Sequence, residues 1–346
     1  MKRIPSLDGL RAISILLVVI GHWAATHSFP IAMSYAFLGV RFFFVISGYL
    51  ITTLLLREQS QTATISLSEF YIRRAYRILP AATIFLATML ITRRHELTWY
   101  HAAMAVLYLA DFDPTRPMFF GHLWSLSVEE QFYLLWPSIL KKWYAYRVRI
   151  LLAVVAIGPF SQLALYALHY PGIVTHTFFA VADNLAIGCL LAVFASRSPV
   201  VPKWLGFVLV MMIVFIPPFE GVSRARTLVI LFLLLPLLYV AIAGLLVHVV
   251  QTPYRLLNLG PVVWLGKISY SLYLWQQIFV FDQRARPWYF MLFAVGAASL
   301  SYYVVEKPML QLREKLATKK SRSIRLFVAH QVNEPLLATS VKDLSR

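Results

Sequence analysis

The sequence predicts an all-α integral membrane protein with about ten transmembrane helices, a short re-entrant or interfacial helix, and both termini in the cytoplasm. Of its 346 residues, 60% are hydrophobic and 14% are charged, and the mean hydropathy is +0.69. Soluble domains average roughly 45–50% apolar and about 25% charged residues. Lipid must therefore replace water along much of the chain, which excludes a soluble enzyme, a disordered chain and, with Cys189 as the single cysteine, a disulfide scaffold.

Apolar stretches of helical length define the candidate spans. They lie at residues 10–25, 38–56, 78–92, 99–110, 123–140, 150–168, 176–195, 204–217, 227–250, 262–281 and 288–305. The first follows Lys2 and Arg3 but is followed by no small-residue cleavage site, so we interpret it as an uncleaved first helix. The fourth has only about half the length that a span needs, which favours a re-entrant or interfacial helix.

The distribution of basic residues supports this interpretation of the fourth stretch. If it does not cross the membrane, 24 of the 32 Lys and Arg residues lie on the cytoplasmic side; if it crosses, only 12 do. The positive-inside rule therefore favours ten spans. The net charge of +17 is then explained by basic residues in cytoplasmic loops that face anionic lipid. The sequence contains no motif for binding nucleic acid. Since no repeat or linker divides the chain, we expect one membrane domain at residues 1–316 and a basic cytoplasmic tail at 317–346.

Ionisable side chains inside the spans are the first candidates for function, because each costs roughly 2.5–3.5 kcal/mol on insertion scales. Arg11 and His22 lie eleven residues apart, which places them on one face of the first helix and about 16.5 Å apart along its axis. Histidine suits proton transfer near neutral pH. The alternative is that His22, beside Trp23, only anchors the helix end in the interface.

A polar stripe on the fifth stretch points to the same level of the membrane. Ser125, Glu129, Tyr133 and Trp136 follow a helical spacing, so Glu129 is predicted to face inward, at a depth close to that of His22. A carboxylate there could orient a general-base histidine. The alternative is a structural ion pair with an arginine such as Arg41.

Basic residues before the third span indicate an anion site. Arg74 and Arg77 are neighbours at i and i+3, so two guanidinium groups lie side by side, as a diphosphate requires, with Arg73 adjacent. Positive-inside anchoring is the alternative explanation. No P-loop, dinucleotide fingerprint, nucleophile elbow or Cys/His metal cluster is present in the sequence, so we expect no metal.

Six segments in order resemble the membrane-bound acyltransferase family 3, which O-acylates bacterial surface glycans and some small molecules. Arg11 with His22 resembles the R-x10-H signature, and the segment HLWSLSVEEQFYLLWP, which begins at His122, is the most specific match. The others are G-x-x-x-F-F-x-x-S-G, R-x-x-R-I-x-P, LGKISYSLYLW and VEKP, at residues 39–48, 74–80, 265–275 and 305–308.

The resemblance implies a catalytic histidine and an acyl-CoA donor. Under it His22 is catalytic and acts with Glu129, and acyl-CoA, usually acetyl-CoA, is held by Arg11, Arg73, Arg74 and Arg77. We assign contacts with the acceptor to Arg41, His122, Ser125 and Tyr133. Whether His22 deprotonates the acceptor hydroxyl or carries the acyl group covalently stays open.

Two segments depart from the family pattern. Many members carry His-x-Pro where this chain has Gln276-Gln277-Ile278, which bears on the choice of acceptor. Val181 stands where an Arg-x-Asp motif ending at Asp183 has its arginine. Some members add an extracytoplasmic esterase-like domain; we expect this chain to complete the transfer itself or to need a separate extracytoplasmic transferase.

The resulting expectation is a multi-pass enzyme of the bacterial plasma (inner) membrane. It would move an acyl group, most often acetyl, to a hydroxyl of a carbohydrate or lipid-linked glycan, such as O-antigen, exopolysaccharide or peptidoglycan. Two alternatives remain: an acyltransferase that acts on a small metabolite, and a proton-coupled transporter or flippase whose ionisable groups relay protons.

Overall fold

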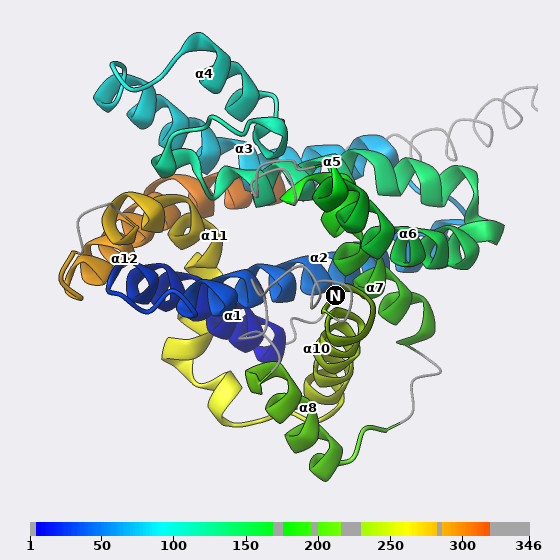
Figure 1. Cartoon of the computed structure of the whole chain (residues 1–346). Coiled ribbons are helices and arrows are strands. Elements are labelled where there is room, and N and C mark those ends of the chain that lie inside the picture. The colour runs from blue at the N-terminus through cyan, green and yellow to red at the C-terminus, as the bar shows by residue number, and fades with distance from the viewer. Residues whose placement is uncertain (1–4, 169–175, 196–199, 216–229, 282–285, 319–346) are drawn as a thin grey trace, which may run out of the picture.

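A computed structural model describes residues 5–168, 176–195, 200–215, 230–281 and 286–318, and all regular structure within these ranges is helical (Figure 1). The α-helices are α1 (Pro5–Thr26), α2 (Ala32–Thr62), α3 (Leu67–Thr92), α4 (Trp99–Val106), α5 (Leu123–Lys142), α6 (Arg147–Ala167), α7 (Phe178–Phe194), α8 (Lys203–Phe215), α10 (Leu235–Gln251), α11 (Gly260–Val280) and α12 (Phe290–Ser301). Short π-helical segments, Ile230–Leu234 and Tyr302–Glu306, precede α10 and follow α12, and residues 307–318 continue as helix. Most of the predicted tail at 317–346 lies outside the described residues.

The all-α membrane class is confirmed for the described residues. Five helices are long and apolar enough to cross a membrane: Ser6–Thr26, Ala32–Thr62, Leu67–Thr92, Tyr144–Leu165 and Phe232–Gln251. Helices α7 and α8 are apolar but shorter. Large apolar side chains such as Ile91, Leu134 and Leu300 are exposed on the outer surface, where lipid would cover them. The number of spans and the side on which the termini lie remain predictions.

Helix α2 runs through the centre of the structure. It packs against α1 on one side and α7 on the other, and α1 also packs against α11 (Figure 1). Helix α12 covers α11, whereas α6 covers α7, and α8 packs against α10. The buried face of α2 continues for several turns and includes Leu38, Phe42, Phe44, Val45 and Ile51. The central position of α2 lets one helix face contribute to a site between α1, α3, α5 and α11.

Two glycines let the backbones of α2 and α7 cross closely. A Cβ atom on Gly48 would overlap the carbonyl oxygen of Leu185, and one on Gly188 would overlap the carbonyl oxygen of Val45. The contact is reciprocal, and both obstructing groups are backbone atoms that cannot rotate away. The small residues at these two positions therefore permit the close crossing.

The fourth apolar stretch forms only the eight-residue helix α4, which is about 12 Å long and too short to span a membrane. The chain after α4 runs alongside the first three turns of α5. Ser127 Oγ accepts the amide of Ala110 at 3.1 Å, and Gln131 Nε2 donates to the carbonyl of Tyr108 at 3.0 Å and to Asp111 Oδ1 at 2.8 Å. These contacts reach the third turn of α5, as a re-entrant segment would.

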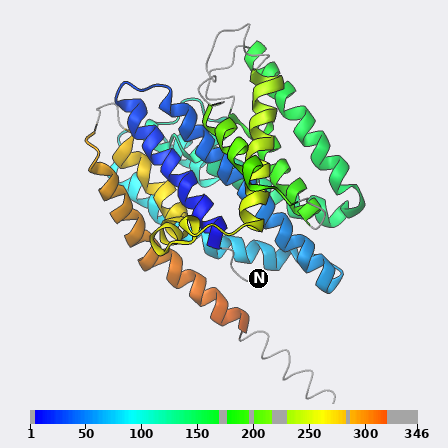
Figure 2. The ribbon, with the colours of Figure 1, turned by 90° about the horizontal axis from the view of Figure 1, so that it is seen from below.

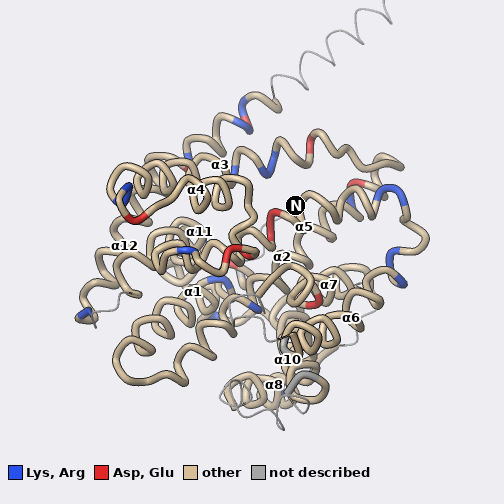
Figure 3. Tube along the Cα trace, turned by 45° about the horizontal axis from the view of Figure 1, so that its top comes forward, with Lys and Arg blue, Asp and Glu red and all other residues tan. Residues whose placement is uncertain are grey.

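Charged residues are sparse along the helices (Figure 3). Basic residues follow the turn between α5 and α6 and the last helical residues, whereas acidic and basic residues meet between α1, α5 and α11 (Figure 3). The beginning of α1 and the far end of helix 307–318 lie at the same end of the bundle (Figure 2).

Candidate active site

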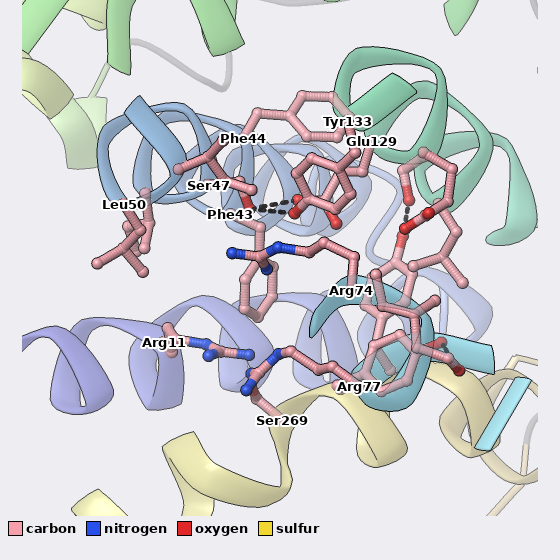
Figure 4. Close-up of a pocket in the computed structure, with 18 of the residues that line it drawn as sticks. Arg11, Phe43, Phe44, Ser47, Leu50, Arg74, Arg77, Glu129, Tyr133 and Ser269 are labelled. Carbon is pink, nitrogen blue, oxygen red and sulfur yellow. Dashed lines mark hydrogen bonds between the residues drawn. The ribbon is translucent and has the colours of Figure 1, made fainter. Parts of the chain in front are cut away.

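A cavity of about 270 Å³ lies where α1, α2, α3, α5 and α11 meet (Figure 4). Apolar residues of α2, among them Phe43, Phe44 and Leu50, form one wall. The polar lining comes from five helices and consists of Arg11, Ser47, Arg74, Arg77, Ser125, Glu129, Glu130, Tyr133, Ser269, Tyr270 and Tyr273. Six of the residues that the sequence singled out are therefore brought together: Arg11, Arg74, Arg77, Ser125, Glu129 and Tyr133.

Helix α5 presents its predicted polar stripe to this cavity. Ser125, Glu129 and Tyr133 line it, and Trp136, one turn further, is buried and donates from Nε1 to Thr52 Oγ1 of α2 at 2.8 Å. That last hydrogen bond fixes the rotation of α5 against α2, so the stripe faces the cavity. Glu130, which points about 100° away from Glu129 around the helix, also lines the cavity.

The Glu129 carboxylate is the end of a short hydrogen-bonded series. Tyr133 donates its hydroxyl to Ser47 Oγ at 3.2 Å, and Ser47 donates to Glu129 Oε1 at 2.6 Å (Figure 4). A buried carboxylate needs such donors or a nearby positive charge. Both are present, since the arginines of the cavity surround it. The ion pair with Arg41, considered from the sequence, is not the arrangement seen, because the charge beside Arg41 is that of Asp183.

Three arginines from two helices converge on the cavity. The side chain of Arg11 on α1 points toward that of Arg77 on α3, and Arg74 extends above them toward Glu129 and Tyr133 (Figure 4). The Arg74 guanidinium lies 5.1 Å from the ring centre of Tyr133. Within the described ranges, none of the three forms a salt bridge shorter than 4.0 Å. Guanidinium groups that face one another across a cavity are an arrangement suited to an anion.

A hydrogen bond on the wall of the cavity joins α5 and α11. Ser125 Oγ and the hydroxyl of Tyr273 are 2.5 Å apart, and Ser125 also donates to the carbonyl of His122. Both residues line the cavity and are buried. One turn further along α11 from Tyr273 lies Gln276, so a rise of roughly 5 Å separates the end of the cavity from the next polar position.

His22 lies beside Gln276 of α11 rather than on the wall of the cavity. Its Nδ1 is 3.0 Å from Oε1 of Gln276, and its ring lies against that of Phe281, with the ring centres 4.9 Å apart. We expected Glu129 to orient this ring. In the described structure the hydrogen-bond partner of His22 is Gln276 and that of Glu129 is Ser47, because α5 turns its carboxylate toward the arginines.

Three other residues assigned from the sequence lie elsewhere. Arg73 pairs with Glu58 of α2 at 3.1 Å, because adjacent residues on α3 point about 100° apart and Arg74 takes the inward direction. Arg41 lies near Asp183 of α7. His122 is buried between Phe85 and Tyr273, one turn beyond Ser125, and its ring nitrogens have no hydrogen-bond partner among the described residues.

Sequence reasoning missed the contribution of α11. Ser269, Tyr270 and Tyr273 line the cavity, and Gln276 contacts His22. Two signals were present: the LGKISYSLYLW motif at residues 265–275, which contains the three cavity residues, and the departure at residues 276–278, which we had connected with the acceptor. Ser47 was also missed, although it lies in the small-residue run of α2. Among the described residues, no group of three or more His, Cys, Asp and Glu side chains is placed to hold a metal ion.

Comparisons with known proteins agree with the motifs. The acyltransferase domain profile matches residues 4–306. The peptidoglycan O-acetyltransferase OatA of Listeria monocytogenes is 30% identical over 318 residues, covering 79% of this chain and 49% of the relative. The O-acetyltransferase OatA of Staphylococcus aureus is 30% identical over 360 residues, covering 89% of this chain and 57% of the relative.

The chain thus spans about half the length of the curated relatives that it matches. No solved structure matches it. The match to the domain profile nonetheless extends over nearly the whole sequence and includes every helix that lines the cavity. The chain therefore belongs to the membrane-bound acyltransferase family 3, as its six motifs predicted.

Proposed function

We propose that the protein is a membrane O-acetyltransferase that moves an acetyl group from acetyl-CoA to a hydroxyl group of a cell-envelope carbohydrate. Membership of the acyltransferase family supports the reaction class. Relatives named O-acetyltransferases support the acetyl group, and one of them is named for peptidoglycan. Peptidoglycan is therefore the first acceptor to test, followed by O-antigen, exopolysaccharide and small hydroxylated metabolites.

The observation that carries the proposal is the convergence of Arg11, Arg74 and Arg77 on one cavity. Two guanidinium groups that face each other repel unless an anion lies between them. The diphosphate of CoA has the charge and the bidentate oxygens that such a pair recognises. Binding it there would supply binding energy remote from the reacting bond. Glu129, through Ser47 and Tyr133, would hold the arginines in this arrangement.

The position of His22 suits a reaction at the thioester end of the extended acetyl-CoA molecule. With the diphosphate at the arginines, the pantetheine arm would extend past Ser125 and Tyr273 toward Gln276 and His22. When bound, acetyl-CoA supplies an activated acyl carbon. His22 takes the proton of the acceptor hydroxyl, the acceptor oxygen forms an ester bond to that carbon, the carbon–sulfur bond breaks, and the thiolate takes the proton from His22.

We also propose ten spans, with both termini on the cytoplasmic side of the bacterial plasma membrane. The short α4, the contacts of residues 108–111 with α5, and the common end shared by α1 and helix 307–318 support this topology. Cys189 is the only cysteine and is buried, so a Cys189→Ser background permits single-cysteine labelling. Cysteines at Ser60 and Lys142 should react only from the cytoplasmic side, and one at Glu96 only from the other side; the reverse result would contradict the topology.

The decisive experiment measures transfer of labelled acetyl groups. Purified protein in liposomes is incubated with labelled acetyl-CoA and peptidoglycan fragments, and products are identified by mass spectrometry. The wild type should acetylate a carbohydrate hydroxyl, and His22→Ala should be slower by at least about 100-fold. The control is His27→Ala, since His27 contacts only its own helix turn. Full activity of His22→Ala would exclude the catalytic role, and absence of both transfer and acetyl-CoA hydrolysis would favour transport.

A further inference from the structure

Three hydrogen bonds connect His22 to the backbone of the loop before α5. His22 Nδ1 lies 3.0 Å from Gln276 Oε1, Gln276 Nε2 lies 3.3 Å from Gln277 Oε1, and Gln277 Nε2 lies 2.8 Å from the carbonyl oxygen of Met118. The series joins α1, α11 and the 3-10 turn Met118–Phe120. Both glutamine side chains are buried, with 0% and 3% of the residue exposed.

The direction of each bond in this series is set by its last member. A backbone carbonyl only accepts, so the group of Gln277 that faces Met118 must be the amide nitrogen. The oxygen of Gln277 then faces Gln276, which must present its own nitrogen there. Gln276 is left with its oxygen toward His22, and that oxygen needs a donor. The ring nitrogen Nδ1 of His22 must therefore carry a hydrogen.

A neutral imidazole has one N–H group, so a proton on Nδ1 leaves Nε2 as the basic nitrogen. We propose that Gln276 and Gln277 are positioning residues that hold His22 in this tautomer. The consequence for catalysis rests on the proposed function of His22 as the general base, whereas the tautomer itself does not. This arrangement sets the tautomer of His22 without a carboxylate beside the ring. It agrees with the position of Glu129, which accepts a hydrogen bond from Ser47 instead.

The surroundings hold the series in place. The carbonyl of Met118 also accepts the amide of Gly121, and Arg116 donates to the carbonyls of Ala110, Asp113 and Gly121, so the loop that carries the terminal acceptor is itself fixed. A Cβ on Gly121 would lie 2.8 Å from Gln277 Nε2, which shows how closely the backbone approaches that amide. An unpaired buried amide is unfavourable, so rotation of either glutamine would be opposed.

The direct test is spectroscopic. The protein is labelled with ¹⁵N histidine, and the two ring-nitrogen signals of His22 are assigned by their loss in His22→Ala. Above the pH at which the ring becomes neutral, Nδ1 of the wild type should give a protonated signal and Nε2 an unprotonated one. The opposite assignment, or a mixture of both tautomers, would overturn the proposal. Because this readout requires no activity, it stands even if His22→Ala proves to be active.

Variants separate orientation of the ring from general packing. Gln276→Met has a similar size but accepts no hydrogen bond, so we expect mixed tautomers and a fall in kcat of about 10–100-fold. Gln277→Met removes the donor to Met118 and should also mix the tautomers. Gln276→Glu keeps an acceptor oxygen beside Nδ1 and should retain the wild-type tautomer and more activity than Gln276→Met. Equal loss in both Gln276 variants with an unchanged tautomer would indicate a packing role only.

Gln162 offers a matched control. Its Nε2 donates to the carbonyl of Ala180 at 2.6 Å, so Gln162→Met also removes a partly buried amide that bonds to the backbone, but it does so away from His22. The His22 signals should be unchanged in this variant. A changed tautomer in Gln162→Met would mean that the tautomer responds to general loosening of the fold, which would contradict the specific role of residues 276 and 277.

Discussion

The hydroxyl of Tyr273 lies 2.5 Å from Ser125 Oγ, and both residues line the arginine-containing cavity. The two residues are 148 positions apart in the sequence and belong to α11 and α5. A donor that enters among the arginines must displace or bypass this pair to reach the histidine. Under the proposed function, this contact would lie between the donor site and the reacting histidine.

Removing this contact should admit water to the reaction level. In Tyr273→Phe the hydroxyl is lost, while Ser125 keeps its bond to the carbonyl of His122. The hydroxyl also donates to the carbonyl of His122 at 3.4 Å, and that contact is lost as well. We expect hydrolysis of acetyl-CoA in the absence of acceptor to rise on the order of 10-fold, with the KM for acetyl-CoA unchanged. Tyr71→Phe, which removes a hydroxyl bonded to the carbonyl of Leu134, is the control. Unchanged hydrolysis would show that the pair does not act as a barrier.

Substitutions of Arg77 and Arg73 should differ sharply in their effect on the KM for acetyl-CoA, although the two residues are only one turn apart on α3. Arg77→Gln removes one of the two facing guanidinium groups, so the KM for acetyl-CoA should rise by about 10–100-fold with little change in kcat. Arg73→Gln disrupts only the pair with Glu58, and its KM should rise far less. Steady-state kinetics at several acetyl-CoA concentrations measures both. Equal increases in KM for the two variants would mean that the diphosphate binds nearer the N-terminal end of α3.

The crossing of α2 and α7 should not accept even one methyl group. In Gly188→Ala the new Cβ meets the Val45 carbonyl and the Tyr49 amide, which belong to the backbone. We expect a loss of stability of about 1–3 kcal/mol, measured by thermal unfolding in detergent. Gly296→Ala is the matched control, because no atom lies within 4 Å of its new Cβ. A small gain in stability is expected for this variant. Equal melting temperatures would contradict the close crossing.

The segment after α4 should detach from α5 when Gln131 is replaced. Gln131→Leu leaves the carbonyl of Tyr108 and Oδ1 of Asp111 without their donor, an unfavourable change of about 1–3 kcal/mol. Hydrogen exchange of residues 107–112 should then accelerate. Gln59→Leu, in which an exposed amide is removed, should leave this exchange unchanged. Exchange as slow as in the wild type would argue that other contacts hold the segment.

Helical spacing was enough to predict the side of α5 that faces the cavity. Ser125, Glu129 and Tyr133 line the cavity because they repeat at intervals of four, and Arg74 and Arg77 lie together because their interval of three is also close to one helical turn. Spacing cannot decide between adjacent residues that are all polar. The choice of Arg74 over Arg73, and the inclusion of Glu130, depend on how the helices are rotated in the bundle.

Contacts between distant helices could not be predicted from the spacing. Nothing in the segment around Gln276 shows that its side chain meets His22, 254 residues earlier. The sequence placed Glu129 and His22 at similar depth, but depth alone does not bring two side chains together. The family motifs gave the order of the segments and the expectation that the histidine is catalytic, whereas the hydrogen-bond partner of that histidine depends on the packing of α1 against α11.

The facing arginines Arg11 and Arg77 also bear on the balance between stability and activity. The carboxylates of Glu129 and Glu306 lie near the two guanidinium groups and offset part of their mutual repulsion, and a bound anion would offset it further. Substitutions that relieve the remaining repulsion should raise the melting temperature of the ligand-free protein while they weaken the donor complex. Selection for a more stable fold and selection for tighter binding of the proposed donor would therefore act in opposite directions on Arg11 and Arg77.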